Sequence, residues 1–166
     1  TASGARWAVD SWPRANGEPP DIMPLAAWRS AQVRQRSHAD EVVAAIDRLR
    51  DRFDVAQYGE VAYGGERFPL LAVRSSGWDE SLPCVLVTGG VHGYETSGVH
   101  GALEFLRHEA ARYAGRANLL VVPCVSPWAY ERINRWNAEA VDPNRSFREP
   151  SPAEESAALM RLVAPL

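Results

Sequence analysis

The sequence has few cysteines, no long apolar run and no recognisable secretion signal. Its two cysteines, Cys84 and Cys124, are too few for a disulfide framework and favour buried free thiols in a cytoplasmic protein. No apolar segment approaches the roughly 20 residues that cross a bilayer. The opening stretch "TASGARWAVDSWPR" lacks both a basic segment followed by an apolar core and an initial Met. We therefore expect a cytoplasmic protein without a membrane partner, whose N-terminus has been trimmed or replaced.

An excess of positive charge is also missing. The 18 Lys and Arg residues are scattered among 21 Asp and Glu residues, which gives a net charge of −3. This balance gives no indication of a nucleic-acid partner. The 46% of apolar and 23% of charged residues are ordinary for a globular protein, and 166 residues is near the usual length of one domain. We therefore expect a single domain over residues 1–166, of unknown oligomeric state.

The order of helical and extended patterns predicts the fold class. Residues 1–36 contain several prolines and are predicted to form an irregular, wrapping arm. The elements expected after it are a helix from Ser37, a hairpin around Gly64–Gly65, an apolar strand over 84–87, a helix over 95–115, an apolar strand over 118–125 and a helix from about residue 151.

The two apolar strands joined by a helix predict parallel pairing through a right-handed crossover, with both strand faces covered. We therefore predict an α/β fold with a mixed, largely parallel central sheet flanked by helices. Such a sheet usually continues with another strand after a helix like the last one. We expect the 166 residues to be the N-terminal portion of a longer polypeptide.

The stretch "VTGGVHGYETSGVHG" (87–101) places His92 and Glu95 three residues apart in a glycine-rich loop. The loop follows an apolar strand, at the edge of the sheet where α/β proteins bind their ligands. An imidazole and a carboxylate from one loop can share a zinc ion, although zinc needs a third protein ligand. The spacing alone leaves open both a metal site and a plain polar loop.

Other residues in the sequence limit what this spacing can mean. His38 and Glu41 have the same spacing at the start of the first predicted helix, and we interpret that pair as structural and exposed. A phosphate-binding loop is disfavoured, because the stretch matches neither G-x-G-x-x-G nor G-x-x-x-x-G-K-[ST] and puts Glu95 at the helix N-terminus. His100 and His108 fall within the following helix, and neither is a convincing third ligand.

A second polar loop follows the strand over 118–125. Its sequence "SPWAYERINRWNAEAVDPNRSF" carries Arg132, Arg135, Asn144 and Arg145. A guanidinium beside an amide suits the fork-like recognition of a carboxylate. The competing interpretation is a solvated surface loop with its aromatic side chains in the core, and the loop by itself favours this second interpretation.

Together, the two loops resemble the zinc carboxypeptidases of the carboxypeptidase A type. That family carries H-x-x-E after a strand, then N-P-D-G, and then R-x-N-x-x-G-V-D-L-N-R-x-F. This chain has "GGVHGYETSG" and, about forty residues later, "ERINRWNAEAVDPNRSF", so the resemblance spans roughly residues 82–149. The bacterial branch with the murein-peptide amidases, and the related succinylglutamate desuccinylase and aspartoacylase group, share these elements.

The resemblance implies a role for each matched residue. His92 and Glu95 match two zinc ligands, with one Zn²⁺ expected per site. Asp142 matches the acid that holds the other nitrogen of the ligand histidine, which fixes its tautomer. Asn144 and Arg145 match the pair that grips the terminal carboxylate of the substrate.

The same resemblance implies that Arg135 stabilises the oxyanion when activated water attacks the carbonyl.

The chain also departs from the family. Trp128 stands in place of the acid of N-P-D-G and is expected to reshape the neighbouring pocket, and Pro143 fixes φ beside the carboxylate clamp. No histidine follows His108, so the third zinc ligand is absent from this chain, as is the glutamate expected to act as general base.

The predicted function is that of a zinc-dependent metallocarboxypeptidase, which hydrolyses a C-terminal peptide or amide bond with metal-activated water. Its substrate would be a peptide or acyl-amino acid with a free carboxylate. An N-acyl-amino-acid deacylase or a wall-peptide amidase of the same family is an alternative. A non-catalytic carboxylate-binding module is an alternative of another class. The 166 residues alone are not expected to turn over substrate.

Overall fold

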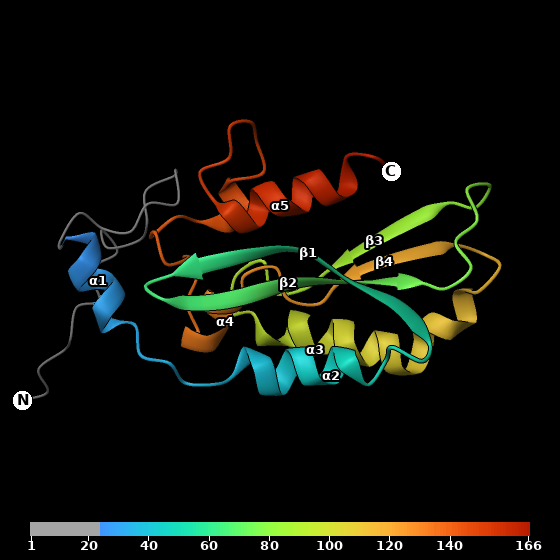
Figure 1. The fold of residues 1–166 in the computed structure, drawn as a ribbon, viewed down its shortest axis with the longest axis horizontal. Helices are drawn as coiled ribbons and strands as arrows, with labels where there is room; N and C mark the ends of the chain where they lie inside the picture. The colour runs from blue at the N-terminus through green and yellow to red at the C-terminus, as the bar shows by residue number, and fades with distance from the viewer. Residues whose placement is uncertain (1–23) are drawn as a thin grey trace, which may run out of the picture.

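The computed structural model describes residues 24–166, in which helices cover both faces of one mixed sheet (Figure 1). The sheet has the strand order β1-β2-β4-β3, with α2 and α3 on one face and α5 on the other. The α/β class is thus confirmed.

The elements in chain order are α1 (Leu25–Ala31), η2 (Ala39–Val43), α2 (Ala44–Asp47), β1 (Phe53–Tyr63), β2 (Glu66–Ser75), β3 (Cys84–Thr88), α3 (Thr96–Glu104), η3 (Phe105–Glu109), η4 (Ala110–Tyr113), β4 (Asn118–Val122), α4 (Pro127–Arg132), η5 (Pro143–Arg145) and α5 (Glu154–Val163).

Strands β1 and β2 form the predicted hairpin. Tyr63 pairs with Glu66 across the turn, so Gly64 and Gly65 are the two turn residues. Their φ angles of 58° and 89° lie in the left-handed region, which glycine adopts without steric cost. Strand β2 then joins the hairpin to the rest of the sheet by pairing antiparallel with β4.

Strands β3 and β4 pair in parallel through α3, as predicted. The sheet is mixed, but within residues 24–166 it is mostly antiparallel rather than largely parallel, because the hairpin docks antiparallel on β4. Strand β4 is buried at every residue, whereas β3 is an edge strand on which Val85 and Leu86 are exposed. The expectation that both apolar strands are covered on both faces is therefore wrong for β3, and Cys84 is exposed while Cys124 is buried.

The core lies between the sheet and its helices. On one face, Val42 and Ile46 pack with Leu103 of α3 against Val121 of β4. On the other face, Leu159 of α5 packs against β4 and β2. Each fully buried side chain of this kind contributes about 1.5–3 kcal/mol to folding. No helix within residues 24–166 is long and apolar enough to cross a membrane.

The segment 24–36 lies against the chain that follows β4. It contains α1, so the expected irregular arm is helical at Leu25–Ala31, and the rest of that prediction, over 1–23, lies outside the described residues. Arg29 Nε donates to the carbonyl of Ala138 at 2.7 Å, and the backbone N–H of Gln35 donates to the carbonyl of Glu131 at 2.7 Å. This segment, called the arm below, therefore holds the second polar loop from outside.

Candidate metal site

The glycine-rich loop leaves β3 and turns directly onto α4. A Cβ atom on Gly93 would lie 1.9 Å from the backbone carbon of Ala129, so only glycine lets the loop approach α4 this closely. The backbone N–H of Tyr94 donates to the carbonyl of Asn134 at 3.0 Å. The close approach brings His92 beside the loop that follows α4.

His92 is buried between two carboxylates. Its Nδ1 lies 2.9 Å from Oε1 of Glu95, and its Nε2 lies 2.8 Å from Oδ1 of Asp142, which is 50 residues away in the sequence. The imidazole is 5% exposed, whereas the Glu95 side chain is 47% exposed. The structure thus brings together three residues singled out in the sequence, of which Glu95 is exposed and the other two are buried.

Asp142 is the centre of the polar network. One oxygen, Oδ1, accepts from the backbone N–H groups of Asn144 at 2.9 Å and Arg145 at 3.3 Å, as the cap of η5. The other oxygen, Oδ2, accepts from Arg135. Burial opposes the charge of this carboxyl, but hydrogen bonds from His92 and Arg135 outweigh it and hold the pKa of Asp142 below its ordinary value. An ionised Asp142 is suited to hold the imidazole in one orientation.

Arg135 faces this carboxylate. Its Nε and Nη2 lie 3.0 and 2.7 Å from Oδ2 of Asp142, and its Nη1 donates to the hydroxyl of Tyr94 at 3.1 Å. A guanidinium has five N–H groups, so two remain beyond these three contacts. The role of Arg135 as an oxyanion donor stays a prediction, and those two N–H groups are the ones that would serve it.

Tyr94 is a residue that the sequence did not single out. Its ring stacks on the imidazole of His92, with centroids 5.6 Å apart and planes inclined by 6°. Tyr94 is 42% exposed, whereas the His92 on which it stacks is buried. The only signal for it in the sequence is its place between the two residues of the H-x-x-E pattern.

Asn144 and Arg145 are exposed on η5, and within the described part of the chain their side chains make no hydrogen bond or ion pair. Pro143 begins η5 and is buried, and its carbonyl accepts from the hydroxyl of Ser156 in α5 at 2.7 Å. The backbone carbonyl of Pro143 thus joins η5 to α5. The side chains of the predicted clamp lie next to Asp142 in sequence and are open to solvent.

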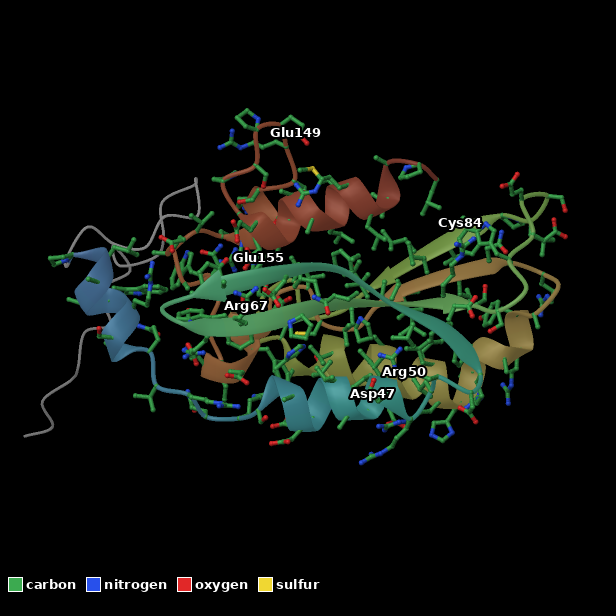
Figure 2. The ribbon with its side chains drawn as sticks, viewed as in Figure 1. Asp47, Arg50, Arg67, Cys84, Glu149 and Glu155 are labelled. Atoms are coloured by element: carbon green, nitrogen blue, oxygen red, sulfur yellow. The ribbon has the colours of Figure 1, made fainter. Side chains whose placement is uncertain are left out.

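A buried carboxyl on α5 supports the same loop. Glu155 is 1% exposed and lies at the start of α5, close to the hairpin (Figure 2). Its Oε2 accepts from the hydroxyl of Tyr63 and from the amide of Asn137, both at 3.1 Å. Burial raises the pKa of Glu155 above its ordinary value, although these hydrogen bonds lower it. Asn137 in turn accepts from two backbone N–H groups of the loop before Asp142, so the loop is built around paired polar groups.

The remaining candidates lie elsewhere. His100 is beside the hydroxyl of Tyr130 at 3.4 Å, and His108 pairs with Glu104 at 3.1 Å. Trp128 is 1% exposed in the core, and its expected effect on a neighbouring pocket stays a prediction. The guanidinium of Arg132 lies 4.6 Å from the Trp128 ring and pairs with Glu66. We therefore interpret His100, His108 and Arg132 as structural residues rather than as parts of the metal site.

The donor set fits a zinc ion in part. An imidazole Nδ1 and a carboxylate oxygen converge, and a second carboxylate holds the other ring nitrogen, which is the usual support of a metal-bound histidine. Residues 24–166 hold no group of three His, Cys, Asp or Glu residues that could bind a metal. His92 and Glu95 therefore suit two positions of a site that needs one more protein ligand.

Comparisons with known proteins agree with this geometry. No family model matches the sequence, and no curated protein matches it. Among solved structures, candidate metallopeptidases from Shewanella denitrificans OS217 and Shewanella baltica OS155 are each 26% identical, with a TM-score of 0.64, over 75% of this chain and 47% and 49% of theirs. A metallo-carboxypeptidase from Burkholderia cenocepacia is 18% identical, with a TM-score of 0.62, over 76% of this chain and 38% of its own, and shares the fold.

The chain spans about half the length of the first two of these structures. The resemblance seen in the sequence is confirmed at the level of the family, whereas the bacterial branch stays a prediction. The chain is similar in fold and sequence to these metallopeptidases, and this similarity supports a zinc carboxypeptidase-like family.

Proposed function

We propose that the protein is a zinc-dependent metallocarboxypeptidase that hydrolyses a C-terminal peptide or amide bond. The observation that carries the proposal is the convergence of His92 Nδ1 and Glu95 Oε1 at 2.9 Å, with Nε2 of the same ring held by buried Asp142. A plain polar loop has no need of a buried imidazole between two carboxylates. The third zinc ligand and the general base are to be sought in the part of the relatives that this chain does not span.

Each residue has a defined task in this proposal. Zinc, when bound, would supply Lewis-acid activation of a water molecule and of the substrate carbonyl. His92 and Glu95 would hold the ion, and Asp142 would keep the proton on Nε2 so that Nδ1 presents its lone pair. Arg135 has two N–H groups left to stabilise negative charge on the carbonyl oxygen.

Substrate selection is assigned to η5. Asn144 and Arg145 are exposed there and offer an amide and a guanidinium for a carboxylate. A related fold supports this choice of ligand: a metallo-carboxypeptidase from Pseudomonas aeruginosa, 19% identical, was solved in complex with (2-guanidinoethylmercapto)succinic acid. We therefore propose a peptide or acyl-amino acid with a free carboxylate as substrate.

The first test is zinc content, measured on the purified full-length protein together with His92→Ala, Glu95→Ala and the control His108→Ala. We expect about one zinc per wild-type and control molecule and a loss of zinc in both loop variants, whose circular dichroism should stay unchanged. His108 is the matched control because its side chain is 67% exposed and lies outside the site. A zinc-free wild-type protein, unaffected by removal of His92, would exclude the proposed metal chemistry.

The second test separates the exopeptidase from its alternatives with paired peptides that carry a free or an amidated C-terminus. A carboxypeptidase cleaves only the free peptide, and Arg145→Ala should raise its KM. Equal cleavage of both peptides would instead indicate an amidase or deacylase.

The lack of a third ligand within residues 24–166 also leaves a carboxylate-binding module as a second candidate. That module would bind a free-carboxylate peptide equally well with and without a chelator and would cleave neither peptide.

A further inference from the structure

Tyr94 separates the two candidate ligands in "HGYE" and contacts more of the site than its sequence position suggests. Its ring lies nearly parallel to the His92 imidazole, and its hydroxyl accepts from Nη1 of Arg135 at 3.1 Å. Its backbone N–H donates to the carbonyl of Asn134. This hydrogen bond ties Tyr94 to the loop that carries Arg135, called the arginine loop below. With 42% of its surface exposed, Tyr94 contributes little to the core, so packing alone does not account for its contacts.

Four side chains thus form a closed circuit. His92 Nε2 faces Asp142 Oδ1, Asp142 Oδ2 accepts from Arg135, Arg135 donates to Tyr94, and Tyr94 stacks back on His92. The contacts with Asp142 and Glu95 fix the positions of the two ring nitrogens but leave the imidazole free to tilt about the line that joins them. A parallel ring on its face removes that tilt. The circuit therefore restrains the imidazole plane as well as its nitrogen.

We propose that Tyr94 is a positioning residue of the candidate metal site, whose ring sets the plane of the His92 imidazole and whose hydroxyl holds Arg135 against Asp142. Nδ1 of His92 then faces Glu95 without any metal, so that the two residues would offer a metal ion two ligand atoms already in place. The inference rests on the proposed function for its use of zinc, but the restraint on His92 exists without any metal.

The first test measures the restraint in the metal-free, full-length protein through the ¹³C relaxation order parameter of the His92 Cε1–H bond. Tyr94→Leu removes both ring and hydroxyl, and Tyr94→Phe removes only the hydroxyl. We expect the order parameter to fall by about 0.2 or more in Tyr94→Leu, and by less in Tyr94→Phe. Tyr113→Leu is the matched control, since Tyr113 is 38% exposed and packs on Phe105 at the end of η4, away from the site. An unchanged order parameter in Tyr94→Leu overturns the proposal.

The second test measures zinc affinity by competition with a chromophoric chelator. We expect Tyr94→Leu to weaken binding about 10- to 100-fold and Tyr94→Phe about 3- to 10-fold, as for other groups that orient a metal ligand, with Tyr113→Leu unchanged. Wild-type affinity in Tyr94→Leu overturns the proposal even if His92 becomes mobile. If the wild-type protein binds no zinc, the proposed function fails, and the order parameter alone decides whether Tyr94 positions His92.

Discussion

At the scale of single residues, His38 shows what burial does to a titratable group. It is 3% exposed, its ring lies 6.4 Å from that of Phe68, and its backbone N–H donates to Oε1 of Glu131 at 2.8 Å. Burial lowers the pKa of His38 from 6.5 to about 4. Folding therefore keeps this imidazole neutral at pH values where the unfolded chain would protonate it.

This lowered pKa predicts a loss of stability in acid. The contribution of His38 is complete above pH 6.5 and is lost as the pH falls towards 4, because the unfolded state binds the proton first. Between pH 7 and pH 4, the wild-type protein should lose roughly 3 kcal/mol more unfolding free energy than His38→Gln. Urea unfolding at several pH values measures this difference, with His108→Gln as an exposed control. Parallel pH profiles for wild type and His38→Gln would contradict the assignment.

His38 also shows how far sequence reasoning reaches at this scale. The pairs His38–Glu41 and His92–Glu95 have the same spacing, and they were distinguished by the apolar strand before His92 and by the later "VDPNRSF" motif. The predicted structural role of His38 agrees with its geometry, but its predicted exposure is wrong, because it lies against Phe68 of β2 and Glu131 of α4. The contact of Arg135 with Tyr94 could not be predicted either, since a motif fixes which residues are near but not where their side chains point.

At the scale of elements, the loop that carries Arg135 is bounded by backbone strain. Ile133 and Ala140 are the two non-glycine residues with positive φ within the described range, at 53° and 59°. L-residues with a Cβ adopt this region at a cost of roughly 1–2 kcal/mol. Ala140 stands where the family pattern R-x-N-x-x-G-V-D has its glycine. The left-handed turn is kept, although the residue that favours it is absent.

A glycine at this turn should therefore be tolerated far better than one two residues earlier. Ala140→Gly relieves the strain but loses a largely buried methyl group and makes the unfolded chain more flexible, so its unfolding free energy should change by about 0.5 kcal/mol or less. Ala138 is fully buried with φ outside the left-handed region, and Ala138→Gly should destabilise by about 1–2 kcal/mol. Urea denaturation measures both variants. Equal losses would show that Ala140 is not strained.

The sheet shows where prediction of elements from the sequence succeeds and where it stops. The hairpin was predictable because two glycines must supply left-handed φ angles. The strands Cys84–Thr88 and Asn118–Val122 are equally apolar in sequence, yet one is an exposed edge and the other is central. Burial depends on which strands lie alongside, and a local apolar pattern carries no information about the neighbours.

At the scale of the whole molecule, the arm and the arginine loop form one unit. Arg29 donates to the carbonyl of Ala138 and pairs with Glu139 at 2.6 Å, and Asn134 donates to Gln32 at 2.6 Å. Trp28 lies 5.9 Å from the buried ring of Trp128. The arm thus contacts both ends of the segment that positions Arg135.

Removal of Arg29 should loosen this unit. Arg29→Ala leaves the carbonyl of Ala138 without its charged donor and should lower the unfolding free energy by about 1 kcal/mol, with faster amide exchange in residues 134–142. The control Arg50→Ala removes an exposed pair with Asp47 at the end of α2 (Figure 2) and should cost less than about 0.5 kcal/mol. Exchange that stays unchanged across 134–142 would mean that the arm does not hold the loop.

The arm has a consequence for the order in which the protein assembles. Its hydrogen bonds to the arginine loop join residues that are 97 to 110 positions apart, with the whole sheet between them in the sequence. Closing so long a span costs conformational entropy. The contacts that compensate for this cost form only once the strands between the two segments are in place. We therefore expect the loop bearing Arg135 to be fastened last during folding and released first on opening. The ability to bind a metal ion would then be acquired at the end of folding, after the sheet is complete.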